Sequence, residues 1–109
     1  MKVHIKRHVR GLVAEAIIAH APNNKRVQVF VRSYRDGFYY PQAVPYLDAE
    51  QGTKRLHARV VLGDEGYPFG LYGVIAVALD TEARWDPVDE LPTGTRSRMI
   101  RVVRTGITR

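Results

Sequence analysis

The sequence of 109 residues contains no cysteine. A disulfide scaffold and a zinc site built on thiolates are therefore both excluded. The absence of cysteine fits a reducing compartment, and we expect a cytoplasmic protein. No apolar run is long enough for a signal peptide or a membrane-spanning helix, so we expect no association with a membrane.

Sequence patterns that carry chemistry are equally scarce. His4 and His8 have the spacing of helical zinc ligands, but their segment alternates as a strand and no HExxH motif is present. Neither Ser33 nor Ser97 lies in a nucleophile elbow. The segment 63–66 has two glycines but is acidic, so it would repel phosphate. We therefore expect a protein that is not an enzyme and that binds neither a metal nor another cofactor.

The length and composition predict a single domain, residues 1–109, with 45% hydrophobic and 26% charged residues. The net charge of +6 is unevenly distributed along this domain. Residues 1–35 and 91–109 are strongly basic, whereas residues 64–90 hold seven acids and one arginine. Two interpretations fit this pattern. The basic ends pair with the acidic segment inside the fold, or they form a basic face for nucleic acid or anionic lipid.

Residues 69–80 form the longest nearly unbroken apolar run of the chain. The β-branched Val74, Ile75 and Val77 favour a strand, and Gly70 and Gly73 would weaken a helix. An apolar run of this length between turn signals is typical of a strand buried on both faces. We predict that it is the central strand of a β-sandwich.

Alternating apolar and polar residues predict further strands on both sides of this run. Residues 12–20 fit a strand or a helix, and both alternatives stay open. About seven strands are expected, near residues 2–6, 9–18, 26–34, 38–47, 53–62, 71–80 and 97–105. The predicted core comprises Val29, Val31, Leu56, Ala58, Val60, Tyr72, Val74, Ala76 and Ile100.

The connections between these strands also carry signals. Asp36 and Gly37 tolerate positive φ at both positions of a turn and predict a hairpin there. Residues 48–52 predict a second turn, and residues 82–94 a long loop with room for one helical turn. We interpret Trp85, in this acidic loop, as a plug over one end of the core.

The order of short motifs along the chain resembles that of bacterial and archaeal immunoglobulin-like β-sandwich modules. The matching segments are residues 9–11, 27–32, 39–42, 58–63, 68–70, 72–78, 91–92, Ser97 and 101–104. The resemblance implies a non-catalytic accessory or interaction module without a cofactor. Tyr72, two residues before Val74, also has the spacing of the tyrosine corner of immunoglobulin domains. We therefore expect a buried ring whose hydroxyl bonds to nearby backbone.

Two hypotheses for the function follow from these features. In one, the protein is a structural or interaction module that binds a protein partner. In the other, it is a β-domain that binds nucleic acid weakly through its basic terminal strands, helped by aromatic residues that stack on bases. We expect the first and last strands to run side by side in parallel. The candidate binding surface comprises Lys2, Lys6, Arg98, Arg101, Tyr39 and Tyr40.

Overall fold

The computed structural model describes residues 1–47, 55–67 and 69–106, and this part of the chain forms strands and no helix. It consequently holds no helix of the length and apolarity needed to cross a membrane. The strands are β1 (Lys2–His4), β2 (His8–Val9), β3 (Val13–Ala19), β4 (Arg26–Ser33), β5 (Tyr39–Pro41), β6 (Tyr46–Leu47), β7 (Leu56–Val61), β8 (Phe69–Leu79), β9 (Gly94–Arg96) and β10 (Ile100–Thr105).

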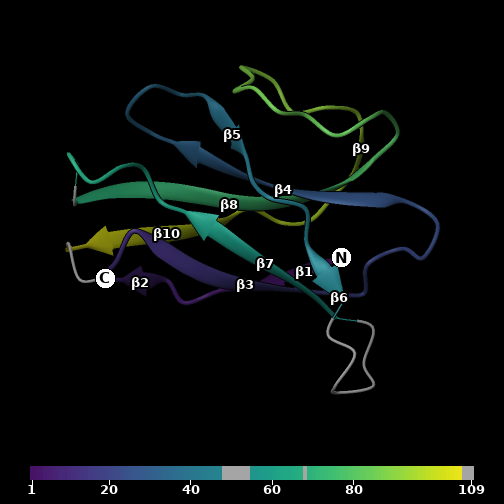
Figure 1. Ribbon diagram of the computed structural model, residues 1–109, viewed down its shortest axis with the longest axis horizontal. Coiled ribbons are helices and arrows are strands. Elements are labelled where there is room, and N and C mark those ends of the chain that lie inside the picture. The colour runs from purple at the N-terminus through teal and green to yellow at the C-terminus, as the bar shows by residue number, and fades with distance from the viewer. Residues whose placement is uncertain (48–54, 68, 107–109) are drawn as a thin grey trace.

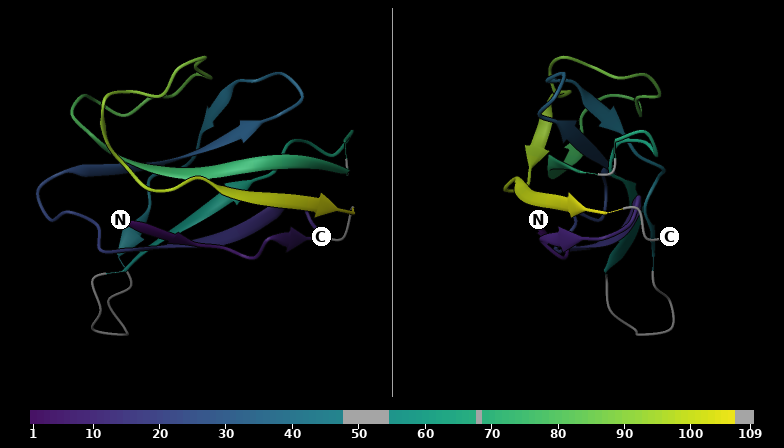
Figure 2. Two further views of the ribbon diagram at one scale, coloured as in Figure 1. Left: turned by 180° about the vertical axis from the view of Figure 1, so that it is seen from behind. Right: turned by 90° about the vertical axis from the view of Figure 1, so that its left-hand side faces the viewer.

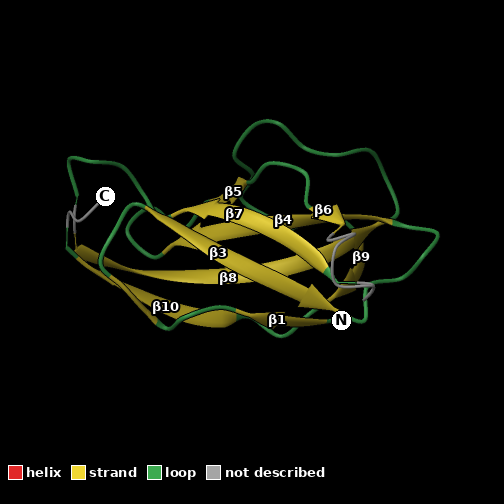
Figure 3. Ribbon diagram, turned by 60° about the horizontal axis from the view of Figure 1, so that its bottom comes forward, coloured by secondary structure: helices red, strands yellow, loops and turns green. Residues whose placement is uncertain are grey.

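The strands form two sheets that pack face to face, as Figure 1 and Figure 3 show. The four-stranded sheet has the order β1-β3-β7-β6, and its neighbouring strands are all antiparallel. The six-stranded sheet has the order β2-β10-β8-β4-β5, with β9 pairing with β8 as well. β9 pairs with residues 77–79 of β8 and β10 with residues 69–74, so the two follow one another along the same edge of β8. The predicted all-β, two-layer sandwich is confirmed.

Strand β8 is central in the six-stranded sheet and is buried on both faces over most of its length. Its residues Tyr72, Val74, Ala76 and Ala78 face the four-stranded sheet and join the main core. The alternate residues 75, 77 and 79 form a second apolar cluster on the outer face. Because both faces are covered, the strand needs apolar residues at nearly every position, which explains the long apolar run.

The core between the sheets contains the residues that alternation predicts. Seven of the nine predicted residues are buried: Val29, Val31, Ala58, Val60, Tyr72, Val74 and Ala76. The other two, Leu56 and Ile100, are partly buried and pack against the same cluster. Arg104 also lies in this interior, although its charge gave no sign of burial.

The connection from β8 to β9, residues 80–93, covers part of the outer face of the six-stranded sheet. Its residues Ala83, Val88 and Leu91 pack on the outer cluster. Gln28 on β4 anchors the connection, since its Oε1 accepts a 2.9 Å bond from the Arg84 N–H and its Nε2 donates a 2.8 Å bond to the Arg84 carbonyl. This anchoring explains why a polar residue is buried at position 28.

Trp85, in the same connection, does not plug the core. Its side chain is 79% exposed, so the sequence-based interpretation is wrong. The smaller apolar residues of the loop cover the sheet instead. The helical turn for which the sequence left room is not present either, since residues 82–94 of the structure contain no helix.

Several of the observed strands differ from those expected. Residues 9–18 are not one strand, because the chain leaves β2 in the six-stranded sheet and enters β3 in the four-stranded sheet. Residues 12–20 form a strand, not a helix, and it ends before His20, which has a φ of 59°. Residues 38–47 are also divided, into β5 and β6 of different sheets, and the prolines at 41 and 45 flank the break. Strand β9 was not predicted, since its three residues show no alternation.

The predicted hairpin connects β4 to β5, but its turn has a different geometry. The Gly37 N–H donates to the Ser33 carbonyl at 2.8 Å, and the Ser33 N–H donates to the Phe38 carbonyl at 3.1 Å. Gly37 has a φ of 81°, whereas Asp36 does not have positive φ. Asp36 instead accepts a 2.9 Å bond from the Phe38 N–H, which shapes the turn. The turn predicted at 48–52 lies outside the described residues.

The parallel pairing expected of the first and last strands is made by β2, not by the first strand β1. β2 pairs with β10 in parallel, with His8 opposite Val103, and the Val103 N–H donates to the Arg7 carbonyl at 2.8 Å. Figure 2 shows this pair from two further sides. Residues 2–4, however, belong to the other sheet, where they pair with β3. The N-terminal segment thus contributes a strand to each layer.

Candidate functional site

The structure divides the predicted binding surface into two parts. Lys2, Lys6, Arg98 and Arg101 are exposed on the N-terminal segment and around β10. Tyr39 and Tyr40 lie on β5, which is separated from β10 by β8 and β4. The two tyrosines also point to opposite faces, since Tyr39 packs on the outer cluster and Tyr40 lines a cavity. Cations and tyrosines therefore do not form one continuous surface.

The acidic loop does not cover the basic N-terminal segment. In Figure 1 and Figure 2, residues 80–93 lie on the side of the molecule away from β1 and β3. Among the described residues, one ion pair joins the two kinds of charge, that of Lys25 with Asp80. Within residues 1–47, 55–67 and 69–106, neither Arg98 nor Arg101 forms an ion pair. Glu15 lines the same shallow hollow as Lys2 and Lys6, and lowers the positive charge there.

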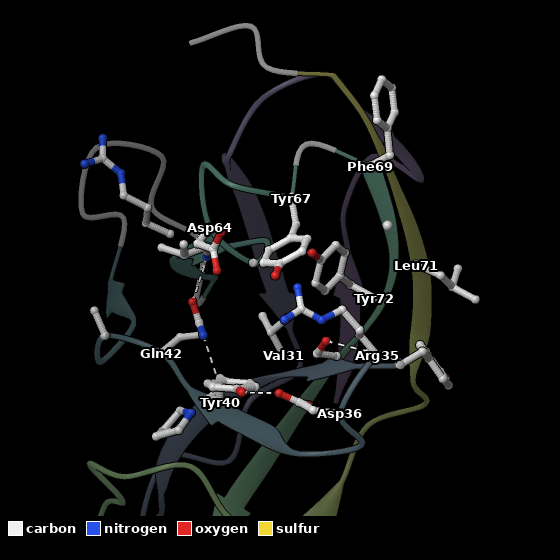
Figure 4. A pocket seen from close by; sticks show the side chains of 18 residues that line it. Val31, Arg35, Asp36, Tyr40, Gln42, Asp64, Tyr67, Phe69, Leu71 and Tyr72 are labelled. Carbon is white, nitrogen blue, oxygen red and sulfur yellow. Dashed lines mark hydrogen bonds between the residues drawn. The ribbon is translucent and has the colours of Figure 1, made fainter.

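One half of the outer face of the six-stranded sheet is left bare. The loop 80–93 covers Ile75, Val77 and Leu79, and the side chains of Met99 and Tyr34 lie against Gly73, but the first residues of β8 are left uncovered. Phe69 is 71% exposed and Leu71 is 40% exposed, and in Figure 4 the Leu71 side chain points away from Tyr72 on the other side of the strand. An exposed apolar surface on a sheet is typical of a protein-binding site.

The neighbours of Leu71 extend this bare surface across the sheet. Val103 pairs with Leu71, His8 pairs with Val103, and the Tyr34 N–H donates to the Leu71 carbonyl at 3.4 Å. We call the outward surface formed by Phe69, Leu71, Val103, His8 and Tyr34 the bare face. It is a row of apolar and aromatic groups that crosses the six-stranded sheet.

Two cations border the bare face. Arg32 and Arg101 pair with Gly73 from its two sides and lie on the outer face of the sheet. The guanidinium carbon of Arg32 lies 5.1 Å from the ring centre of Tyr34 and 5.4 Å from that of Tyr39, so its charge is held between two aromatic rings. No described acidic residue forms an ion pair with either arginine. The rim of the bare face is therefore cationic.

A cavity of about 760 Å³ lies beside β8 at the same end of the sandwich, and its lining includes Tyr34, Phe69 and Leu71 of the bare face. Val31 and Tyr72 contribute to its inner wall, and its mouth lies between the β4–β5 hairpin and the connection from β7 to β8, as Figure 4 shows. Gln42 closes one side, because it donates to the Tyr40 carbonyl at 2.9 Å and accepts from the Val61 N–H at 2.8 Å. The volume lies within the range of small-molecule sites.

The cavity contains the groups whose pKa is shifted. A hydrogen bond from the Tyr40 hydroxyl lowers the pKa of the Asp36 carboxyl, and the same bond raises the pKa of Tyr40. Burial raises the pKa of the Tyr72 hydroxyl, while the charge of Arg104 opposes this rise. Shifted groups that gather in one cavity mark it as a candidate binding site.

Tyr72 is buried, as expected of a corner tyrosine. Its ring packs on Gly63 and Gly70, and a Cβ added to Gly63 would lie 2.2 Å from the Tyr72 hydroxyl oxygen. The expected bond from this hydroxyl to nearby backbone is not found among the described residues. Burial of the ring is therefore confirmed, whereas the hydrogen bond of a tyrosine corner is not.

The backbone of the β7–β8 connection is held by Arg104 instead. The Arg104 Nη1 donates to the carbonyls of Leu62 at 2.9 Å, Asp64 at 2.7 Å and Tyr67 at 3.3 Å, and Nε donates to the Gly106 carbonyl at 3.1 Å. Arg104 is only 2% exposed. These bonds fix the connection that carries Asp64 and Tyr67 into the cavity wall.

The histidines do not gather into a metal site. His4 and His8 lie on strands of different sheets, and His20 follows β3. No cluster of three histidine, aspartate or glutamate residues is found in the part of the chain that the structure describes. The spacing of His4 and His8 therefore reflects the division of the N-terminal segment between the two layers.

Sequence reasoning missed both the bare face and the cavity. Exposed apolar residues at 69 and 71 were hidden within an apolar run whose other members are buried. Arg35, Tyr67 and Tyr72 come from three separate parts of the chain and meet only through the topology. The one available signal was the cluster of aromatic residues and arginines at 32–40. Comparisons with protein-family models, with curated proteins and with solved structures found no match.

Proposed function

We propose that this protein is a non-catalytic immunoglobulin-like module that binds a protein partner through the bare face. The observation that carries the proposal is the contrast between the two halves of one sheet surface. The chain covers one half with its own loop and leaves Phe69 and Leu71 exposed on the other. A protein that covered the bare half would remove a continuous apolar surface from water.

The order of strands supports the immunoglobulin-like part of the proposal. Immunoglobulin sandwiches have strands A, B, E and D in one sheet and G, F and C in the other, with C′ added in the variable type. The four-stranded sheet has the order A-B-E-D when β1, β3, β7 and β6 are assigned to these strands. The six-stranded sheet contains the order G-F-C-C′ when β10, β8, β4 and β5 are assigned to these. The position of buried Tyr72 near the start of β8 is in keeping with this assignment.

The rim of the bare face indicates the chemistry of the partner. Arg32 and Arg101 lie beside the apolar row, and neither forms an ion pair with a described residue. A partner with apolar side chains surrounded by aspartate and glutamate would bury the row and pair with the rim. Such complementarity accelerates association and selects among partners.

The proposal is tested by capture from a cytoplasmic extract that has been treated with nuclease. The purified full chain, its Leu71→Asp variant and its Val13→Asp variant serve as parallel baits. Val13 is an exposed strand residue of the other sheet and is the matched control. A protein retained by the wild type and by Val13→Asp, but lost with Leu71→Asp, is the expected result. Equal retention by all three baits would contradict the proposal.

Nucleic-acid binding is the second candidate, and the exposed cations of the terminal segments favour it. Lys2, Lys6, Arg98 and Arg101 are exposed, and none of them forms an ion pair with a described residue. Only a few phosphates would be neutralised, so binding would be weak and independent of sequence, and would fall steeply with salt. Titration of a labelled single-stranded oligonucleotide at two salt concentrations tests this candidate. Sequence-selective binding at physiological salt would show that the terminal cations, not the bare face, carry the main function.

A further inference from the structure

The protein-binding function proposed above does not account for the cavity at the end of the sandwich. Its wall includes the rings of Tyr40, Tyr67 and Tyr72 and the charged side chains of Arg35 and Asp36. Binding sites for small molecules combine such an apolar wall with a few polar groups that fix the orientation of the ligand. Tyr34, Phe69 and Leu71 line both the cavity and the bare face, whereas Arg35, Tyr40 and Tyr67 belong to the cavity alone, so the tests below use Arg35.

Arg35 is a charged group of the cavity wall that is free to bind a ligand and is held in place by an aromatic ring. Its guanidinium carbon lies 3.4 Å from the ring centre of Tyr67, which holds the planar group against the cavity wall. Its side chain forms no hydrogen bond and no ion pair with the described residues. A guanidinium presents its N–H donors in a fixed fork that matches the two oxygens of a carboxylate.

The acids of the cavity are already engaged. Asp36 accepts hydrogen bonds from the Tyr40 hydroxyl and from the Phe38 N–H. Asp64 accepts a 2.8 Å bond from the Gly66 N–H. The unused hydrogen-bonding capacity of the charged groups therefore lies with the donors of Arg35 and of Arg59, which also lines the cavity. The wall holds two arginines and two aspartates, so its formal charge is balanced and does not favour a doubly charged phosphate over a singly charged anion.

We propose that the cavity binds a small organic carboxylate with a flat apolar body. The carboxylate pairs with the Arg35 guanidinium, and the flat body packs between the tyrosine rings and Val31. The stacking on Tyr67 positions the guanidinium before the ligand arrives, so little side-chain freedom is lost on binding.

Three probes that share one ring system test the proposal: indole-3-acetate, its neutral amide indole-3-acetamide, and the cation tryptamine. Each is titrated into the ¹⁵N-labelled protein while backbone and arginine Nε–H resonances are recorded. We expect saturable shifts at the residues that line the cavity, with affinity in the order acid, amide, amine. No saturable shift with the acid at millimolar concentration would overturn the proposal, and so would equal affinity for the acid and the amide.

Variants separate recognition of the charge from recognition of the ring. Arg35→Gln should weaken the binding of indole-3-acetate by about tenfold and leave the affinity for indole-3-acetamide unchanged, because only the acid forms a charge-assisted pair with the guanidinium. Arg98→Gln, an exposed arginine outside the cavity wall, is the matched control and should change neither affinity. Arg35 is exposed on a hairpin turn, so its variant should keep the melting temperature of the wild type. Acid binding that is unchanged in Arg35→Gln would overturn the proposal even if the cavity bound the probe.

Discussion

The guanidinium of Arg104, on the last strand, donates a 2.9 Å hydrogen bond to the carbonyl of Leu62, the residue that follows β7. Both residues are buried, and the bond spans the interior between the two sheets. Further bonds from the same guanidinium reach Asp64, Tyr67 and Gly106. A buried cation without a carboxylate partner is rare, and here backbone carbonyls satisfy it.

Replacing Arg104 should therefore destabilise the protein strongly. In Arg104→Ala, buried carbonyls would lose their donors and a large side-chain volume would be emptied, so we expect a loss of about 3–5 kcal/mol in the free energy of unfolding. Arg104→Lys should recover only part of this loss, because one ammonium cannot reach both the carbonyls of the β7–β8 connection and the carbonyl of Gly106. Urea denaturation measures both variants. A free energy of unfolding for Arg104→Ala within about 0.5 kcal/mol of the wild type would show that the bonds are not needed.

The anchoring of the acidic loop by Gln28 gives a second prediction. Gln28→Ala removes both bonds to the backbone of Arg84 and should cost about 1–3 kcal/mol. The effect should be local, with faster hydrogen exchange at Arg84 and its neighbours in the loop 80–93. Exchange at β3, in the other sheet, is the internal reference. Unchanged protection at the Arg84 amide would contradict the anchoring role.

Tyr72 should contribute through its ring rather than through its hydroxyl. Tyr72→Ala empties ring volume in the core and should cost about 3–5 kcal/mol. Tyr72→Phe should cost less than about 1 kcal/mol, because the hydroxyl forms no hydrogen bond with the described residues. Thermal melts of the two variants check this. A large loss for Tyr72→Phe would show that the hydroxyl is bonded as in a tyrosine corner.

The raised pKa of Tyr72 also predicts a dependence of stability on alkaline pH. In the unfolded chain the hydroxyl ionises near pH 10, whereas burial keeps it neutral to higher pH in the folded protein. The stability that the neutral hydroxyl contributes is fully present below about pH 10 and is lost as the pH rises toward the folded pKa. Tyr72→Phe should remove this part of the loss. Equal slopes of stability against pH above about 10 for both proteins would contradict the shift.

The acidic range should report the bond between Asp36 and Tyr40. The hydroxyl of Tyr40 lowers the pKa of Asp36, so the stability from this bond is present above about pH 4 and is lost as the pH falls through the lowered pKa. The difference in stability between the wild type and Tyr40→Phe should accordingly be largest near neutral pH and shrink in acid. Denaturation of both proteins at a series of pH values measures this difference in stability. A difference that is independent of pH would show that the pair makes no contribution through the ionised carboxylate.

The sequence predicts the parts of this fold that depend on local pattern. The β-branched residues of β8 and the alternation of Val27, Val29 and Val31 each specify a strand and its buried face. The divided segments were not predictable in this way. The alternation of residues 2–9 predicts an extended chain but not a change of sheet. That change depends on the pairing of β1 with β3 in one sheet and of β2 with β10 in the other.

The candidate sites depend on contacts between distant residues and were predicted least well. Leu71 and Tyr72 are adjacent and both apolar, yet one faces solvent and the other the interior. Only the coverage of the outer face by the loop 80–93 decides which residues stay exposed. Alternation places Arg104 on the face of the buried Val102 and Arg101 on the opposite face, and the carbonyls of the β7–β8 connection satisfy Arg104 there. Which of the two faces is covered is not written in the local pattern.

The central claim is that the bare face binds a protein partner. The most direct test is the dissociation constant of the captured partner, measured by calorimetry for the wild type, Leu71→Asp and Val13→Asp. A buried charge at the centre of the face should weaken binding by about 30-fold or more, equivalent to about 2 kcal/mol, while Val13→Asp should bind as the wild type does. A dissociation constant for Leu71→Asp equal to that of the wild type would show that the partner binds elsewhere.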